Sequence, residues 1–289
     1  MATIRNPIEW TGAQLASAAH AAEVVGRSVE HMRETAHSPA PTVRKIGTSD
    51  IWRSLREGFS DFEAYRSDVI FLCATYAIIG LVLARLAFGS DLLPLVFPLA
   101  SGFAIIGPLA AVGLYEMSRL REQGAEVGWS NAFDVIKAPA IGGIAAMGAI
   151  LIAFFLLWLG AAWAIFQATL APILPREPSA MVFAQAVLYT PEGQKMILLG
   201  MGVGFLFALV AMAISVVSFP LLLDRDTGLD TAIGTSVRAV LANPVPMALW
   251  GLVVALGLLG GTLLAFVGLM VVIPVLGHAT WHIYRKLIA

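Results

Sequence analysis

The stretch "IGGIAAMGAILIAFFLLWLGAAWAIFQATL", residues 141–170, contains no charged side chain along its whole length. A helix needs about 20 mainly apolar residues to cross a bilayer. The stretch from Ala140 to Leu170 is therefore a predicted membrane span, long enough that it must tilt or extend beyond the hydrocarbon. The whole chain has the same character, with 58% hydrophobic and 13% charged residues, whereas soluble domains have about 25% charged residues. We expect an integral membrane protein.

Five further apolar stretches have the length of a span, so the sequence predicts an all-α, polytopic membrane helical bundle with six transmembrane helices. The last two are the least clearly divided, because only Gly260, Gly261 and Thr262 offer a turn between them. One helix from Met247 to Tyr284 would be about 57 Å long, nearly twice the hydrocarbon thickness, which favours two spans. The six predicted spans are Asp68–Phe88, Leu92–Ser118, Ala140–Leu170, Lys195–Leu223, Val245–Gly261 and Thr262–Arg285.

A short amphipathic stretch precedes each odd-numbered span. These stretches are "SDIWRSLREGFSDFEAY" (49–65), "WSNAFDVIKAP" (129–139) and "LDTAIGTSVRAVLANP" (229–244). In the first, Ile51, Leu55, Phe59 and Phe62 recur at helical spacing, which predicts one apolar face on a helix lying in the headgroup plane. The pattern predicts three hairpin repeats, each preceded by an interfacial amphipathic helix.

A proline recurs near the charged end of each even-numbered span, at Pro108, Pro220 and Pro274. Each ring removes one intrahelical hydrogen bond, so we expect structural kinks at similar depths. Two interpretations remain open: the kinks shape the bundle, or they are hinges around a cavity.

The N-terminal region, residues 1–46, differs from the six-helix membrane domain at 47–289 because it is polar. Apolar residues spaced by three and four predict a short helix at about 12–34, either marginal on its own or a docking helix for a partner. The motif "HSPAPT" (37–42) indicates a linker after it. No secretory signal pattern is visible in this region, so we expect the start of the chain to stay in the cytoplasm.

Basic residues near the span ends favour one orientation. Ten lie on the side of the two termini and three on the other, so the positive-inside rule predicts that both termini are cytoplasmic in a bacterial inner membrane. The net charge of −1 gives no reason to expect nucleic acid as a partner. The ten are Arg53, Arg56, Arg66, Arg119, Arg121, Lys137, Arg225, Arg238, Arg285 and Lys286, against Arg85, Arg176 and Lys195.

Two histidines, His278 and His282, lie one helical turn apart in the last span and could share a metal ion. Glu116, at the matching end of the second span, is the best candidate for a third ligand. The other three histidines belong to the polar N-terminal region, so too few remain for two haems with paired histidine ligands. We expect no cofactor and no metal, and we expect both rings to lie in an interfacial aromatic belt with Trp281 and Tyr284.

Charged residues also form a predicted polar cluster at the cytoplasmic span ends, consisting of Glu116, Arg119, Asp224 and Arg225. Glu116 and Arg119 are three residues apart and can pair on one helical face. The single cysteine, Cys73, can form no intrachain disulfide. No phosphate-binding loop, CxxC, HExxH or GxSxG pattern occurs, so we expect no enzyme activity.

Several stretches together resemble an uncharacterised family of bacterial six-span inner-membrane proteins. They are "VRKIGTSDIWRSLREGFSDFEAY", "IIGPLAAVGLYEMSRLREQG", "FPLLLDRDTGLDTAIGTSVRAVLANPVPMALWG" and "IPVLGHATWHIYRK". The likeness covers Ile46 to the C-terminus and is most specific from "LLLDRD" to "NPVPMALWG". Some members are labelled cytochrome c oxidase subunit I-like, a chemistry that the histidine count contradicts. A looser likeness exists to six-helix membrane domains such as the membrane part of some glycerophosphodiester phosphodiesterases.

The resemblance implies an architecture and a compartment without a mechanism. The sequence therefore predicts a non-enzymatic membrane protein, a scaffold, assembly or accessory component with the lipid bilayer, other membrane proteins or a second copy as partners. The alternative is a permease or channel for a small solute, with a cavity among the three kinked spans.

Overall fold

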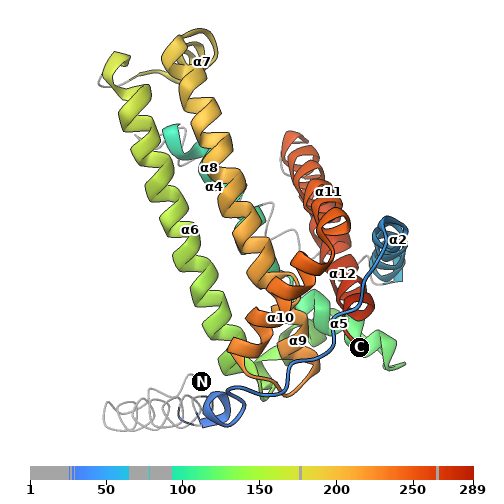
Figure 1. Cartoon of the computed structure of the whole chain (residues 1–289). Helices are drawn as coiled ribbons and strands as arrows, with labels where there is room; N and C mark the ends of the chain where they lie inside the picture. The colour runs from blue at the N-terminus through green and yellow to red at the C-terminus, as the bar shows by residue number, and fades with distance from the viewer. Residues whose placement is uncertain are drawn as a thin grey trace, which may run out of the picture.

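The computed structural model describes residues 26, 28, 30–64, 78, 93–175, 178–264 and 267–289. Within these residues the regular elements are helices, and one isolated bridge joins Val43 to Ile288. Figure 1 shows two long helices, α6 and α8, side by side. The all-α prediction is confirmed.

Two long helices, α6 (Ile141–Thr169) and α8 (Pro191–Ser215), together with the short α7 (Ala180–Tyr189) between them, form what we call the arm. The third predicted span differs from α6 by only one residue at each end. The start of α8 is fixed locally, because the Thr190 side chain accepts a hydrogen bond from the Gly193 backbone N–H at 3.0 Å and Pro191 takes the first helical position. Many large apolar side chains of the arm are exposed, above all on α8, as expected of helices in lipid.

Among the described residues, three helices have the length and composition to cross a membrane: Ile141–Thr169, Pro191–Asp224 and Pro244–Leu263. A bent pair, Leu93–Gly102 with Ala104–Ala110, makes a fourth if it counts as one span. The predicted first span, Asp68–Phe88, lies outside the described residues except for Ile78.

The last two predicted spans form separate helices, α11 (Pro244–Leu263) and α12 (Leu269–Leu287). They approach closely at Gly261, where an added Cβ would lie 2.6 Å from Leu269 Cδ2 and 3.1 Å from the Leu269 backbone nitrogen. The predicted division at Gly261 is two residues early. The second half of α12 carries histidines and basic residues, which is why its composition does not mark it as a span.

The three predicted kink prolines, Pro108, Pro220 and Pro274, do not all lie at a bend or break of a helix. Pro108 lies in α4 (Val96–Ala110), which follows the short turn η1 (Leu93–Leu95) and bends by 42° before Ala104, the residue whose carbonyl loses its partner to the ring.

Pro220 lies in α9 (Ser218–Asp224), just after the break that ends α8. At that break the Val217 backbone N–H donates to Ser236 Oγ at 3.1 Å. Pro274 lies inside α12, where the helix continues through it.

The three amphipathic stretches are helical: α2 (Thr48–Ala64), the 3₁₀ segment η2 (Trp129–Lys137) and α10 (Leu229–Ala242). Of the predicted apolar face of α2, Ile51 and Phe62 are buried and Phe59 is exposed. The buried side of the helix also contains Ser54, Gly58 and Asp61. The reason is close approach, since a Cβ on Gly58 would lie 2.5 Å from the backbone nitrogen of Ala279 in α12.

Residues 37–46 form a strap, an extended segment that runs across α10 to the C-terminus. His37 N–H donates to Asp230 Oδ2 at 3.1 Å, Ser38 Oγ lies 2.8 Å from Thr227 Oγ1, and Ile46 N–H donates to Asn243 Oδ1 at 2.8 Å. The Arg44 N–H donates to the Leu287 carbonyl at 2.7 Å. The stretch predicted as a linker is thus held against the helices along its length.

Candidate functional site at the junction of α2, α5 and α12

The histidine pair lies at the place where α12 meets α2 and α5 (Val112–Glu122). His278 is fully buried, with 0% of its surface exposed, and its Nδ1 lies 2.8 Å from Ser118 Oγ. His282 is one turn further along and partly exposed, with its Nε2 2.9 Å from Asp61 Oδ2. The expected spacing on one helical face is present, and both rings point into the protein.

Asp61 is the centre of this arrangement. Besides His282, its Oδ2 accepts a hydrogen bond from Ser118 Oγ at 2.6 Å, and its Oδ1 pairs with the Arg121 guanidinium. The Asp61 carboxylate also lies 4.0 Å from His278 Nδ1. We call these five residues, Asp61, Ser118, Arg121, His278 and His282, the junction cluster.

Burial acts to raise the pKa of the Asp61 carboxyl, because removal from water disfavours its charged form. Hydrogen bonds from His282 and Ser118, together with the charges of His282 and His278, outweigh this and hold the pKa below its ordinary value. Asp61 is therefore ionised at neutral pH. A charge that is 5% exposed and bound by several donors is a strong constraint on where α2 lies.

Further ion pairs extend the cluster toward the surface. Glu57 of α2 pairs with Lys286, and its Oε2 is 3.7 Å from His282 Nδ1. On α5, Glu122 accepts a hydrogen bond from Arg285 Nε at 3.0 Å. Two helices are therefore tied to the last turns of α12 by charge-assisted bonds.

The predicted polar cluster is partly assembled. Glu116 and Arg119 form a bidentate pair. Arg119 Nε donates to Glu116 Oε2 at 2.8 Å, and Arg119 Nη2 donates to Glu116 Oε1 at 2.8 Å. Asp224 acts on Arg119 through its charge. Arg225 Nε lies 3.8 Å from Asp224 Oδ2, and the Arg225 guanidinium also donates to the Ala289 backbone oxygen at 2.6 Å.

The predicted aromatic belt at the lipid interface is wrong for Trp281 and Tyr284. Both side chains are fully buried. Trp281 Nε1 donates to Glu122 Oε2 at 3.1 Å, and Tyr284 OH donates to Asp224 Oδ2 at 2.6 Å. The aromatic and polar residues at this end of α12 face the neighbouring helices because α2, α5 and α9 surround it.

Metal binding finds no geometric support in the part of the chain that the structure describes, where no three His, Cys, Asp or Glu side chains are placed to hold an ion. Glu116, the predicted third ligand, is paired with Arg119. The residue beside the histidines is Asp61, and His282 Nε2 and His278 Nδ1 already face hydrogen-bond partners within the protein.

Sequence reasoning missed Asp61, Ser118 and Arg121. One signal was available in "REGFSDF", where Gly58 and Asp61 lie one turn apart on a face that also holds Ser54. Small and acidic residues on one face indicate a helix packed closely on a partner with a basic or histidine side chain. Ser118 and Arg121 carried no comparable signal.

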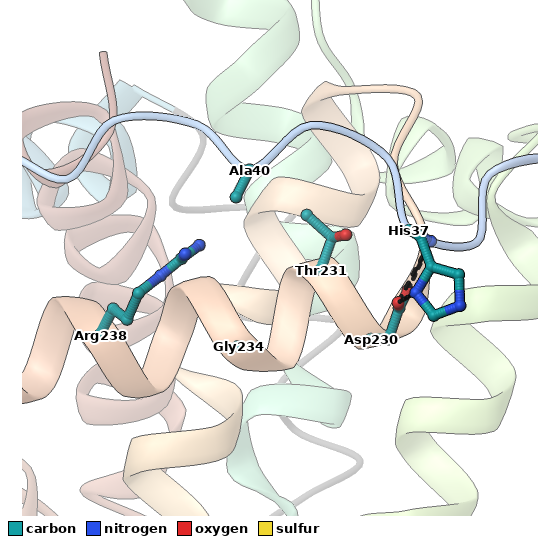
Figure 2. A pocket seen from close by; sticks show the side chains of 6 residues that line it. All are labelled: His37, Ala40, Asp230, Thr231, Gly234 and Arg238. Atoms are coloured by element: carbon teal, nitrogen blue, oxygen red, sulfur yellow. Dashed lines mark hydrogen bonds and ion pairs between the residues drawn. The ribbon is translucent and has the colours of Figure 1, made fainter.

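A shallow groove of about 310 Å³ lies elsewhere, between α10 and the strap. Figure 2 shows Arg238 and Thr231 along its length and His37 paired with Asp230 at one end. None of the three kink prolines lines this groove.

These features define a helical integral membrane protein whose helices are joined at one end by buried ion pairs. Residues 96–224, from the first residue of α4 to the last of α9, match the family model described as predicted integral membrane protein (DUF2189). The match confirms the resemblance to an uncharacterised membrane family. It ends where the "LLLDRD" to "NPVPMALWG" block begins, and it includes Ser118 and Arg121 but not Asp61 or the histidines. No curated protein and no solved structure matches the chain.

Proposed function

We propose that the protein is a non-enzymatic scaffold, assembly or accessory component that holds other membrane proteins in the bacterial inner membrane. The observation that carries this proposal is the strap. Residues 37–46 are fixed to α10 and to the C-terminus by backbone and side-chain hydrogen bonds. The preceding polar region therefore leaves the membrane domain at a fixed place, as a docking segment requires.

The finer architecture is part of the proposal: six spans in three hairpin repeats, each preceded by an interfacial helix, with both termini cytoplasmic. The bridge between Val43 and Ile288 supports two chain ends on one side of the membrane. Exposed Trp52 and Phe59 on α2, and Phe133 and Ile136 on η2, support contact of these elements with the headgroup region.

Reporter fusions test this topology. Fusions at Ser90 and Arg176 should report the periplasm, and a fusion at Ala289 should report the cytoplasm. A periplasmic signal at Ala289 would contradict an even number of spans.

Photo-crosslinking in native membranes tests the scaffold role. A photoreactive residue placed at Val25 or Val29, on the apolar side of the predicted docking helix, should give one discrete adduct with the same membrane protein. The matched control is Ala36, an exposed residue just before the strap, which should give none. A strictly monomeric protein in mild detergent, with no adduct at either position, would reject the proposal.

The second candidate is a permease or channel. The bend in α4 at 42° and the break before Pro220 favour it, because interrupted helices expose backbone groups to a solute. Single cysteines placed beside Pro108 and Pro220, in a Cys73→Ala background, should then react with a polar thiol reagent from the cytoplasmic side. The scaffold proposal expects them to stay unlabelled.

A further inference from the structure

We propose that the junction cluster is a proton-binding site, in which a proton that enters at His282 is passed through Asp61 and the Ser118 hydroxyl to the buried His278. The inference is independent of the scaffold role.

The geometry is a continuous chain of polar contacts. His282 Nε2 lies 2.9 Å from Asp61 Oδ2, Asp61 Oδ2 lies 2.6 Å from Ser118 Oγ, and Ser118 Oγ lies 2.8 Å from His278 Nδ1. Each distance is that of a hydrogen bond, so no water is needed to complete the chain. Its outer residue has 20% of its side chain exposed and its inner residue has none. The chain thus connects the protein surface to a closed interior.

Ser118 links Asp61 to His278 and can pass a proton in either direction. Its hydroxyl has one proton and contacts both Asp61 and His278, so it donates to one of them and accepts from the other. When Ser118 donates to the Asp61 carboxylate, His278 Nδ1 carries the proton of the second bond. When Ser118 donates to His278, the hydroxyl oxygen can accept from a protonated Asp61. The two arrangements differ only in the position of protons.

Proton transfer along this hydrogen-bonded path conserves both protons and charge. The proton on His282 Nε2 passes to Asp61 Oδ2, the Asp61 proton passes to Ser118 Oγ, and the hydroxyl proton of Ser118 passes to His278 Nδ1. Asp61 is again a carboxylate and Ser118 again a hydroxyl. One positive charge has moved from His282 to His278, and no other bond has changed.

Charged groups on all three helices decide where the proton rests. Asp61 of α2 attracts it to either ring, and Glu57 attracts it to His282. Arg121 of α5 and Lys286 of α12 oppose this attraction, since each is already paired with one of these carboxylates. Full burial of His278 disfavours a charged ring there, so His278 carries the extra proton only in passing.

The position of the proton has a structural consequence. Asp61 is the residue through which α2 is bound to α5 and α12, and a proton on His282 strengthens the bond between His282 and the Asp61 carboxylate. The site therefore couples proton occupancy to the packing of α2.

Nitrogen-15 NMR of the histidine rings in the full-length protein in nanodiscs tests the proposal, with His278→Gln and His282→Gln spectra for assignment. Ser118→Ala removes the bridging hydroxyl, and His282→Gln removes the entry. The matched control is Ser215→Ala, which removes another buried serine hydroxyl that donates only to the Ala211 carbonyl.

In the wild type, the Nδ1 proton of the His278 ring should exchange rapidly with water. Positioned proton donors and acceptors accelerate transfer by about a hundredfold or more, so His278 exchange should slow by about that factor in Ser118→Ala and in His282→Gln, and not in Ser215→Ala.

Unchanged exchange at His278 in both variants would overturn the proposal. An effect in Ser118→Ala alone would reject His282 as the entry and, with it, the proposed path. If Ser118→Ala does not fold, His282→Gln decides by the same criterion.

Discussion

The arm and the ion-paired end of the molecule, formed by α2, α5, α9, α10 and the second half of α12, use apolar residues in opposite ways. In the arm, Leu198 and Phe205 are exposed. At the ion-paired end, Tyr115, Phe219 and Trp281 are fully buried, together with the polar His278. The helices of the arm are apolar, whereas α2 and α5 at the ion-paired end mix apolar with charged residues, and the apolar side chains of the two regions differ in what they contact.

This difference indicates which of the two regions determines how the helices pack. Lipid is as apolar as a leucine side chain, so outward-facing residues of the arm favour insertion without selecting a helix neighbour. Buried charges with several partners tolerate few alternatives, because an unpaired charge costs several kcal/mol. We therefore expect substitutions to have large effects at the ion-paired end and small effects on the arm.

The largest expected effect is that of Asp61→Asn, which removes the charge bound by Ser118, His282 and Arg121. Loss of one member of a buried ion pair should lower the free energy of unfolding by about 3–5 kcal/mol. Unfolding in mild detergent measures it. The arm counterpart is Glu192→Gln in the first turn of α8, which should cost less than about 1 kcal/mol. Equal losses of unfolding free energy in Asp61→Asn and Glu192→Gln would contradict the proposed difference between the two regions.

Gly58→Val should have the next largest effect, because the added side chain meets the backbone of Ala279 at 2.5 Å. Overpacking of this kind costs about 1–3 kcal/mol. Gly200→Val on α8 is the matched control, since nothing lies within 4 Å of a Cβ added there. Thermal unfolding and protease sensitivity of α2 should change in the first variant and stay as in the wild type in the second.

Tyr284→Phe removes a hydroxyl that donates to Asp224 Oδ2 at 2.6 Å. The cost should be about 1–2 kcal/mol, because a partly buried carboxylate loses a donor. Tyr189→Phe, at the exposed end of α7, should leave the free energy of unfolding unchanged. A Tyr284→Phe variant as stable as the wild type would show that Arg285 and Arg225 are sufficient partners for Asp224.

Acid should weaken the ion-paired end through Asp61. Its pKa is lowered in the folded protein, so the stabilisation is fully present above the unfolded pKa of about 3.9 and is lost as pH falls through the folded value. The stability difference between wild type and Asp61→Asn should shrink as pH falls below about 4. A difference that persists at acid pH would mean that Asp61 acts without its charge.

The sequence predicted the helices of the arm well because their signals are local. A long uncharged run fixed α6 to within one residue, and Thr190 with Pro191 fixed the start of α8. The histidine pair was found by its spacing, and Glu116 with Arg119 by theirs. The partners of the histidine pair could not be found by spacing. Asp61 and Ser118 are far from His278 in sequence, and the three residues meet only when α2 packs on α12. The lipid-facing interpretation of Trp281 failed for the same reason.

The central claim is that a bond between Asp61 and His282 holds α2 on α12, and a double-mutant cycle tests it most directly. Unfolding in mild detergent would be measured for the wild type, Asp61→Asn, His282→Gln and the double variant. Residues in direct contact within a charged network couple by about 0.5–3 kcal/mol, and we predict about 1–3 kcal/mol here. Effects that add to within about 0.5 kcal/mol would contradict the claim.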